Sequence, residues 1–150
     1  IDEANKDKGD GQGAWNAARV EQAKALVAWA AKLQGENKVK NVFLLGDFNA
    51  YSQEDPIRVI ADAGYTDQGA LTRQSTYLFG GRTGSLDHVF TNASAPKAAK
   101  DREVWNINST ESVGFEYSRF NNNVTDLYSK DARRSSDHDP LGVGCDLRRG

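Results

Sequence analysis

The segment VFLLGDFNAY, residues 42–51, suggests the fold around which the chain is built. Four consecutive apolar residues predict a buried strand, and the glycine, acid and amide that follow predict its polar end. Asp47 or Asn49 alone would be unremarkable, because such residues usually form the turn after a strand. Two later segments carry acidic and imidazole side chains, SLDHVF at residues 85–90 and SSDHDP at residues 135–140. We expect these three strand ends to meet at one site.

Helical patterns flank the predicted strand on both sides. Apolar residues recur every three to five positions from Trp15 to Leu33, which predicts an amphipathic helix that Gly35 ends. On the other side, Asp55 is the predicted N-cap of a short second helix, and Pro56 is its first residue. A helix–strand–helix order is typical of an α/β layered protein.

Further strands are predicted at residues 75–79, 85–90, 103–107 and 141–147. Glycines at residues 80–84 predict the hairpin loop between the first two. The polar stretch at residues 108–134 predicts a long loop that is either disordered or functional. Residues 1–14 predict a flexible glycine-rich linker, in preference to a calcium loop, and residues 15–150 a single domain.

The composition describes a soluble domain without indicating a partner. The 150 residues are 38% hydrophobic, with a net charge of −2 and a mean hydropathy of −0.68. A chain of this length buries a core without disulfides, and a local positive rim would still allow nucleic-acid binding. Cys145 is the single cysteine, which fits a cytosolic protein and equally an extracellular one whose cysteine is unpaired or pairs outside the chain. No apolar run is long enough to span a membrane.

Each polar cluster also has a structural interpretation. An acid or amide after a strand usually makes a turn, and a histidine such as His88 is more often packed or solvated than a ligand. Three such strand ends in one small domain are harder to explain in this way, because α/β sheets bind ligands beyond their strand ends. Asp87 beside His138 would fix the tautomer of the ring and leave Asp137 to face a Mg²⁺ ion. With no P-loop, HExxH or Gly-x-Ser-x-Gly motif, metal-assisted hydrolysis is the favoured chemistry.

Taken together, GQGAWNAAR, GDFNAYSQEDP, SLDHVF and SSDHDPLGVGCDL resemble the C-terminal half of the endonuclease/exonuclease/phosphatase superfamily. Within this deoxyribonuclease-I-like superfamily, the chain is most similar to bacterial extracellular nucleases. The resemblance runs from Gly11 to Leu147 and implies an α/β fold of two packed sheets flanked by helices. We expect this chain to supply about one sheet with its helix layer.

The resemblance also implies an N-terminal half that carries a metal-binding glutamate, an asparagine and a second histidine. No residue of this chain is a candidate for these three. The chain begins at Ile1 and contains neither a methionine nor a signal peptide, so we expect that processing, proteolysis or expression design has removed this half. The missing half is then an expected partner, because it would cover an apolar face of the sheet.

The resemblance assigns roles to the polar side chains. Asp47 would orient or activate the attacking water and touch the metal, and Asn49 would hydrogen-bond the scissile phosphate. Asp137 would help to hold the cation. His138, steadied by Asp87, would stabilise charge on the phosphate or act as the base. Weaker candidates for substrate contacts are Thr76, Arg133 and Arg134, although a solvated loop charge is the favoured interpretation of the two arginines.

We therefore expect a secreted bacterial nuclease that hydrolyses DNA, and as an alternative RNA, with Mg²⁺ as its cofactor and Ca²⁺ or Mn²⁺ as alternatives. The chain alone is expected to be weakly active or inactive, and no membrane partner is expected. A phosphoesterase of the same superfamily that acts on sphingomyelin or inositol phosphates is one alternative. A non-enzymatic fragment or binding module with a vestigial site is the other. Arg19, near the start of the first helix, is interpreted as a solvated or paired side chain in preference to a phosphate ligand.

Overall fold

The computed structural model describes residues 2–95, 99–117 and 125–146. Its helices and strands are, in chain order, α1 (Asn16–Asn37), β1 (Phe43–Asp47), α2 (Asp55–Asp62), β2 (Thr66–Asp67), β3 (Tyr77–Phe79), β4 (Arg82–Gly84), β5 (Asp87–Thr91), β6 (Ala99–Val104) and β7 (Leu141–Cys145). Short 3₁₀ turns lie at Glu3–Asn5, Ala70–Thr72 and Val113–Phe115. The predicted α/β class is confirmed: helices accompany several small antiparallel sheets.

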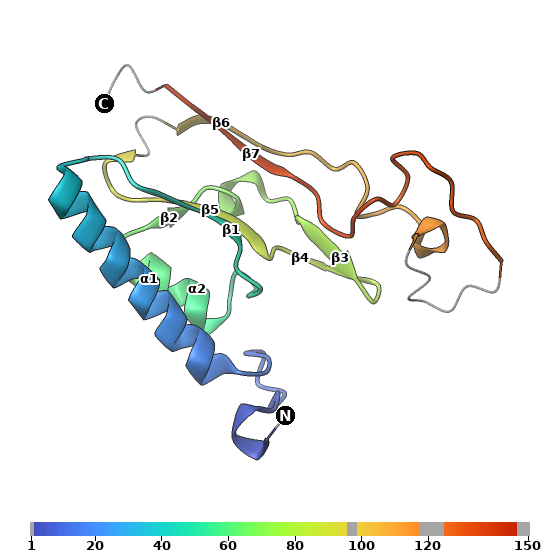
Figure 1. Ribbon diagram of the computed structural model, residues 1–150, viewed down its shortest axis with the longest axis horizontal. Coiled ribbons are helices and arrows are strands. Elements are labelled where there is room, and N and C mark those ends of the chain that lie inside the picture. The colour runs from blue at the N-terminus through green and yellow to red at the C-terminus, as the bar shows by residue number, and fades with distance from the viewer. Residues whose placement is uncertain (1, 96–98, 118–124, 147–150) are drawn as a thin grey trace.

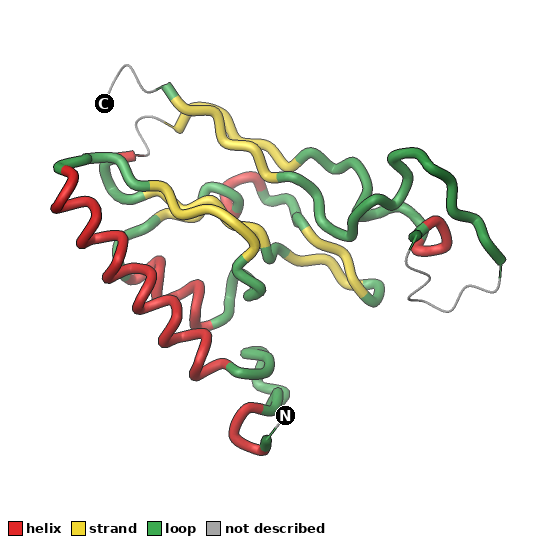
Figure 2. Tube along the Cα trace, viewed as in Figure 1, coloured by secondary structure: helices red, strands yellow, loops and turns green. Residues whose placement is uncertain are grey.

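The central sheet has the strand order β1-β5-β2 and lies between the helices and the β6–β7 ribbon (Figure 1). The β3–β4 ribbon extends beyond one end of this sheet (Figure 2). In the β1–β5 pair, Asp47 lies opposite Asp87 and Gly46 lies opposite His88. The register therefore places the polar end of the GDFN segment directly beside the polar start of the SLDH segment.

The hydrophobic core lies between the central sheet and the two helices. Ile60 of α2 and Phe90 of β5 are fully buried there, and Ala23 and Ala30 of α1 pack against the same cluster. Only one face of β1 takes part, since Leu44 is 8% exposed and Leu45 is 72% exposed. The expectation of a strand buried on both faces is wrong, because neighbouring side chains of a strand point to opposite faces and the helices cover one of them.

Both predicted helices exist, but two of their ends differ from prediction. Gly35 does not end α1, which continues to Asn37. Lys38 adopts the left-handed conformation that caps it, and the backbone N–H of Lys38 donates to carbonyls of the last turn. Glu54, not Asp55, is the N-cap residue of α2. The backbone N–H of Asp55 donates instead to the side-chain oxygen of Gln12, 2.7 Å away.

The hairpin is tighter than the predicted five-residue loop. Its turn is Gly80–Gly81, where both φ angles are positive, and residues 82–84 pair with residues 77–79 as β4. The predicted strand at residues 103–107 lies earlier, as β6, and the two-residue strand β2 was not predicted. Strand β7 matches the predicted last strand, whose end at Leu147 lies outside the described residues.

The last residues before α1 are held against the domain. The side-chain oxygen of Gln12 binds the start of α2, and the backbone carbonyls of Gln12 and Ala14 accept hydrogen bonds from the guanidinium of Arg19. The carboxylates of Asp7 and Asp10 accept from backbone N–H groups two residues further on, as in ordinary turns. Within the described ranges, no helix is long and apolar enough to cross a membrane.

Candidate active site

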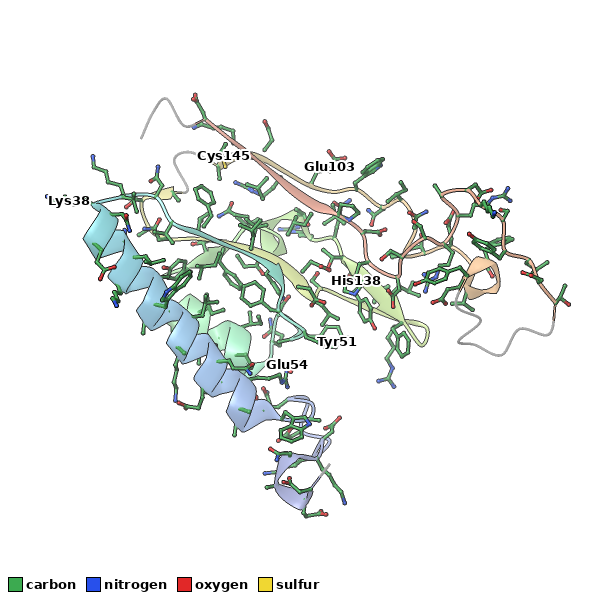
Figure 3. The ribbon with its side chains drawn as sticks, viewed as in Figure 1. Lys38, Tyr51, Glu54, Glu103, His138 and Cys145 are labelled. Carbon is green, nitrogen blue, oxygen red and sulfur yellow. The ribbon has the colours of Figure 1, made fainter. Side chains whose placement is uncertain are left out.

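Backbone hydrogen bonds bring the SSDHDP segment to the end of the central sheet. The N–H of Leu78 donates to the carbonyl of Asp137 over 3.0 Å, and the N–H of Asp139 donates to the carbonyl of Thr76 over 2.7 Å. Tyr77 and His138 form an isolated bridge between these two bonds, which places His138 beside the β3–β4 ribbon (Figure 3). The three polar segments that were expected to meet therefore lie at one place.

His138 is paired with Asp87 across this junction. The Nδ1 atom of the ring lies 2.8 Å from Oδ2 of Asp87, and the two side chains are 29% and 23% exposed. A carboxylate can only accept, so Nδ1 carries the proton of this hydrogen bond. Among the residues that the structure describes, none hydrogen-bonds Nε2 of His138. The pair thus fixes the ring and leaves one nitrogen for a ligand.

The end of β1 presents Asp47 and Asn49 to solvent. The Oδ1 atom of Asp47 accepts a hydrogen bond of 2.7 Å from the backbone N–H of Asn49, which adopts a left-handed conformation with φ of 47°. Asparagine tolerates this conformation better than most residues, because its short side chain bonds locally. The turn keeps both side chains exposed beside the His138–Asp87 pair, so a carboxylate, an amide and an imidazole are available together.

A cleft of about 430 Å³ adjoins this turn and is lined by Asn49, Tyr51 and Tyr77 among others. Its wall contains an ion pair between Arg19 and Glu54, whose charged atoms lie 2.5 Å apart. The same guanidinium donates to the backbone carbonyl of Asn49 over 3.2 Å. Arg19 is therefore a structurally paired side chain, as expected in preference to a phosphate ligand, and it buttresses the Asn49 turn.

The pKa of Tyr77 depends on the charged groups of the site. The ring centroid of Tyr77 lies 4.6 Å from that of His138. Burial raises the pKa of Tyr77 above its ordinary value, the negative charges of Asp137 and Asp47 add to the increase, and the positive charge of Arg134 opposes it. Asp47 and Asp137 thus act on the same phenol from two different segments. Within the part of the chain that the structure describes, no three His, Cys, Asp or Glu side chains form a ready metal-binding group.

A second histidine–aspartate pair lies behind the site and was not predicted. His88 is 1% exposed, with Nδ1 2.8 Å from Oδ2 of Asp67 and Nε2 3.0 Å from the carbonyl oxygen of Ala50. Both partners only accept, so both nitrogens donate and the ring is a cation. Burial lowers the pKa of His88, but the hydrogen bond and charge of Asp67 outweigh burial and raise it overall. His88 is the packed histidine that its position on a strand suggested.

Asp139 is a buried anchor that the sequence did not reveal. It is 1% exposed, and its carboxylate accepts from the backbone N–H groups of Ile107, Asn108 and Ser109 and from the Ser109 hydroxyl. Burial raises the pKa of Asp139, but these four hydrogen bonds outweigh it and lower the pKa below its ordinary value. The carboxylate therefore ties the start of the predicted loop at residues 108–134 to the His138 segment. Residues 118–124 of this loop lie outside the described residues.

The three weaker candidates for substrate contacts differ in how far they are buried. Thr76 is 1% exposed, and its hydroxyl accepts from the backbone N–H of Asp87 over 3.3 Å. Arg134 is 3% exposed, and its guanidinium donates to the carbonyl of Ser109. Both side chains are buried, so Arg134 is not the solvated loop charge that was favoured for it. The phosphate contacts of Thr76 and Arg134 stay predictions. Arg133 is exposed and pairs with Asp131 over 2.9 Å, which matches the favoured interpretation as a loop charge.

Comparison with known proteins decides the family. A model described as the endonuclease/exonuclease/phosphatase family matches residues 4–138. The chain belongs to the endonuclease/exonuclease/phosphatase family. The predicted superfamily is confirmed, and the family supports a hydrolase of the phosphoesterase or nuclease type. No curated protein and no solved structure gives a significant match, so the expected closeness to bacterial extracellular nucleases stays a prediction.

Proposed function

We propose that this endonuclease/exonuclease/phosphatase chain carries part of the active site of a metal-dependent phosphodiesterase that hydrolyses DNA, with RNA as the alternative substrate. The observation that carries the proposal is the His138–Asp87 pair of 2.8 Å, in which Nε2 has no described partner and Asp87 lies opposite Asp47 in the β1–β5 register. Phosphoryl transfer needs positioning and charge stabilisation more than covalent help from the protein. An oriented imidazole, an exposed carboxylate and an exposed amide supply these two requirements.

The proposed roles follow from what each group donates or accepts. Asp47 accepts a proton from the attacking water or orients that water, and the amide of Asn49 donates to a phosphate oxygen. A protonated His138 donates from Nε2 to the phosphate, whereas a neutral ring with its proton on Nδ1 presents Nε2 as a base. The two alternatives predict opposite slopes of rate against pH as His138 titrates, so a pH–rate profile distinguishes them.

The carboxylates of Asp47 and Asp137 are the groups that would hold Mg²⁺, with Ca²⁺ or Mn²⁺ as alternatives. Mg²⁺ is commonly held by one or two carboxylates together with waters and substrate phosphates, and the chemistry of these two residues fits that pattern. When bound, the ion would neutralise charge on the phosphate. We propose that further ligands come from an additional N-terminal segment that packs against Leu45 of β1, which is 72% exposed on the strand face away from the helices.

The choice of nucleic acid over sphingomyelin or inositol phosphates rests on the GQGAWNAAR helix, as does the proposed secreted bacterial origin. In the structure this segment supports the site, because Arg19 binds both Glu54 and the carbonyl of Asn49. A panel of phosphodiester substrates tests the choice: faster hydrolysis of sphingomyelin than of DNA would contradict it.

The decisive experiment is a plasmid-cleavage assay with the purified chain and Mg²⁺, in comparison with His138→Ala and with added EDTA. We expect slow cleavage that both treatments abolish. Robust cleavage with the same sensitivities would support the hydrolase and contradict the expected weak activity. Cleavage unaffected by His138→Ala would overturn the proposed site. Absence of cleavage, together with Mg²⁺ binding that does not depend on Asp137 in calorimetry, would favour a binding module with a vestigial site.

A further inference from the structure

Trp105 is an exposed aromatic side chain beside the candidate active site. It follows strand β6 directly and is 62% exposed. It lines a cleft of about 330 Å³ together with His138 and Asp87. A single exposed indole is common on protein surfaces. The position of Trp105 is what distinguishes it, because it shares a cleft with the His138–Asp87 pair.

The backbone around Trp105 is fixed, so its ring belongs to a built surface. The N–H of Trp105 donates to the carbonyl of Pro140 over 2.9 Å, which continues the β6–β7 ladder past the pair Val104 and Leu141. Two residues later, the N–H of Ile107 donates to the buried carboxylate of Asp139 over 3.2 Å. Both bonds lead to the segment that carries His138, so the indole and the imidazole are positioned by one scaffold.

We propose that Trp105 forms a stacking subsite for a nucleobase of the substrate strand, next to the phosphate that His138 receives. The inference rests on the proposed function, because it takes the phosphodiester to lie at His138. In a polynucleotide every phosphate is one sugar away from a base, so a strand bound there brings a base to the neighbouring cleft. An aromatic face in a site of this kind stacks with any base.

The other residues that line the cleft have few free hydrogen-bonding groups that could recognise the edge of a base. The side-chain nitrogen of Asn108 donates to Glu111 and to the carbonyl of Ala132, and its oxygen accepts from the Ser135 hydroxyl. The Ser136 hydroxyl accepts from the N–H of His138 over 3.0 Å. Both ends of the Asn108 amide already have partners, and the Ser136 hydroxyl, which can still donate, distinguishes bases poorly because it can bond to many of them. The subsite therefore takes bases by their faces. We infer that binding there is tolerant of sequence.

Tryptophan fluorescence tests the subsite without requiring hydrolysis. The probe is a mixed-sequence single-stranded oligodeoxynucleotide in EDTA, and inorganic polyphosphate of equal charge is the base-free control. Trp105→Ala removes the stacking face, Trp105→Phe keeps an aromatic ring, and Trp29→Ala removes a 59% exposed indole on α1 as the matched control. Circular dichroism melts establish that all three variants fold.

We expect the oligonucleotide to quench Trp105 in the unchanged chain. Anisotropy of a dye-labelled oligonucleotide, which does not depend on Trp105, should show that Trp105→Ala weakens its binding about 5- to 150-fold, the range that one stacked base corresponds to. Trp105→Phe should retain most of the affinity, Trp29→Ala all of it, and polyphosphate should bind all variants equally. The inference is overturned if Trp105→Ala binds the oligonucleotide as the unchanged chain does, or if the unchanged chain does not bind it. It is also overturned if a second copy of the chain or another protein segment covers Trp105. Stacking, together with absent plasmid cleavage and Mg²⁺ binding that does not depend on Asp137, would defeat the proposed hydrolysis and leave the subsite standing.

Discussion

Two histidine–aspartate pairs have the same hydrogen-bond length and opposite surroundings. In each, Nδ1 of the ring lies 2.8 Å from a carboxylate oxygen. Strand β5 contributes Asp87 to one pair and His88 to the other, and successive side chains of a strand point to opposite faces. The His138–Asp87 side chains are 29% and 23% exposed, whereas those of His88 and Asp67 are 0% and 12% exposed.

The second ring nitrogen is what separates the two pairs. Nε2 of His88 donates to the carbonyl of Ala50 over 3.0 Å, so all the hydrogen-bonding capacity of that ring is used inside the protein. Nε2 of His138 has no partner among the described residues, and His138 lines a cleft. The same two residue types thus make a structural clamp in one place and an available acid or base in the other.

We call His138–Asp87 the open pair and His88–Asp67 the closed pair. The largest expected effect is on activity, at the open pair. His138→Gln keeps the size of the side chain but removes a titratable nitrogen, and we expect hydrolysis of plasmid DNA to fall about 10²- to 10⁴-fold. The urea midpoint should stay near that of the unchanged chain, because the ring is partly exposed. Initial rates and urea titrations of the same preparation measure both quantities. A rate that stays within a factor of two would break the comparison, since neither pair would then be catalytic.

The matched substitution at the closed pair should act on stability. His88→Gln leaves the carboxylate of Asp67 without its cation, and removal of one partner of a buried pair costs about 3–5 kcal/mol. We expect the free energy of unfolding from urea titration to fall by about this amount. Activity measured per folded molecule at low temperature should change far less than in His138→Gln. A stability loss equal to that of His138→Gln would show that burial does not distinguish the two pairs.

The closed pair also predicts how stability depends on pH. The pKa of His88 is raised above the ordinary 6.5 in the folded chain, so its contribution is full below that value and is lost as pH rises through the raised pKa. Physically, the neutral ring can no longer donate to both Asp67 and Ala50. The stability difference between the unchanged chain and His88→Gln should therefore shrink above pH 6.5. A difference that grows with pH would contradict the buried cation.

The parts of this arrangement that could be predicted from sequence depend on local pattern. Strand β1 and helix α1 follow from apolar spacing, and the meeting of Asp87 with His138 was expected from the polar strand ends. The clamp at His88 could not be foreseen in the same way, because its partner Asp67 stands 21 residues earlier on a two-residue strand. A strand so short has no periodicity, and only the antiparallel register with β5 brings the two side chains together.

The end of α1 and the role of Asp139 were also not predicted. Gly35 is a good helix terminator by composition, but the helix ended where Lys38 took the left-handed conformation. Asp139 drew no prediction, and the four hydrogen bonds to its carboxylate come from three residues about thirty positions earlier in the chain. The helix end is set by the local backbone conformation of Lys38, whereas the burial of Asp139 is decided by tertiary contacts that a single sequence does not display.

A smaller effect on stability is expected from the two carboxylates of the SSDHDP segment, because Asp139 is buried and Asp137 is partly exposed. Asp139→Asn gives up charged acceptor capacity, and hydrogen bonds to a charged group contribute about 1.5–3 kcal/mol each. We expect unfolding free energy to fall by roughly 2 kcal/mol, and the loop at residues 108–134 to be cut faster by protease. Asp137→Asn, at a partly exposed position, should leave both unchanged. Equal losses in the two variants would mean that the loop is not anchored through Asp139.

The smallest effect is expected at neighbouring arginines of contrasting exposure. Arg133 is exposed, pairs with Asp131 and lies 5.8 Å from the centre of the Phe115 ring, whereas the side chain of Arg134 is buried against the carbonyl of Ser109. An exposed ion pair contributes little, so Arg133→Ala should leave the urea midpoint unchanged and weaken oligonucleotide binding slightly at most. Arg134→Ala should lower the midpoint, because it leaves that carbonyl without its donor. A marked loss of oligonucleotide affinity in Arg133→Ala alone would restore this residue as a phosphate contact and extend the nucleic-acid surface from the open pair into the loop.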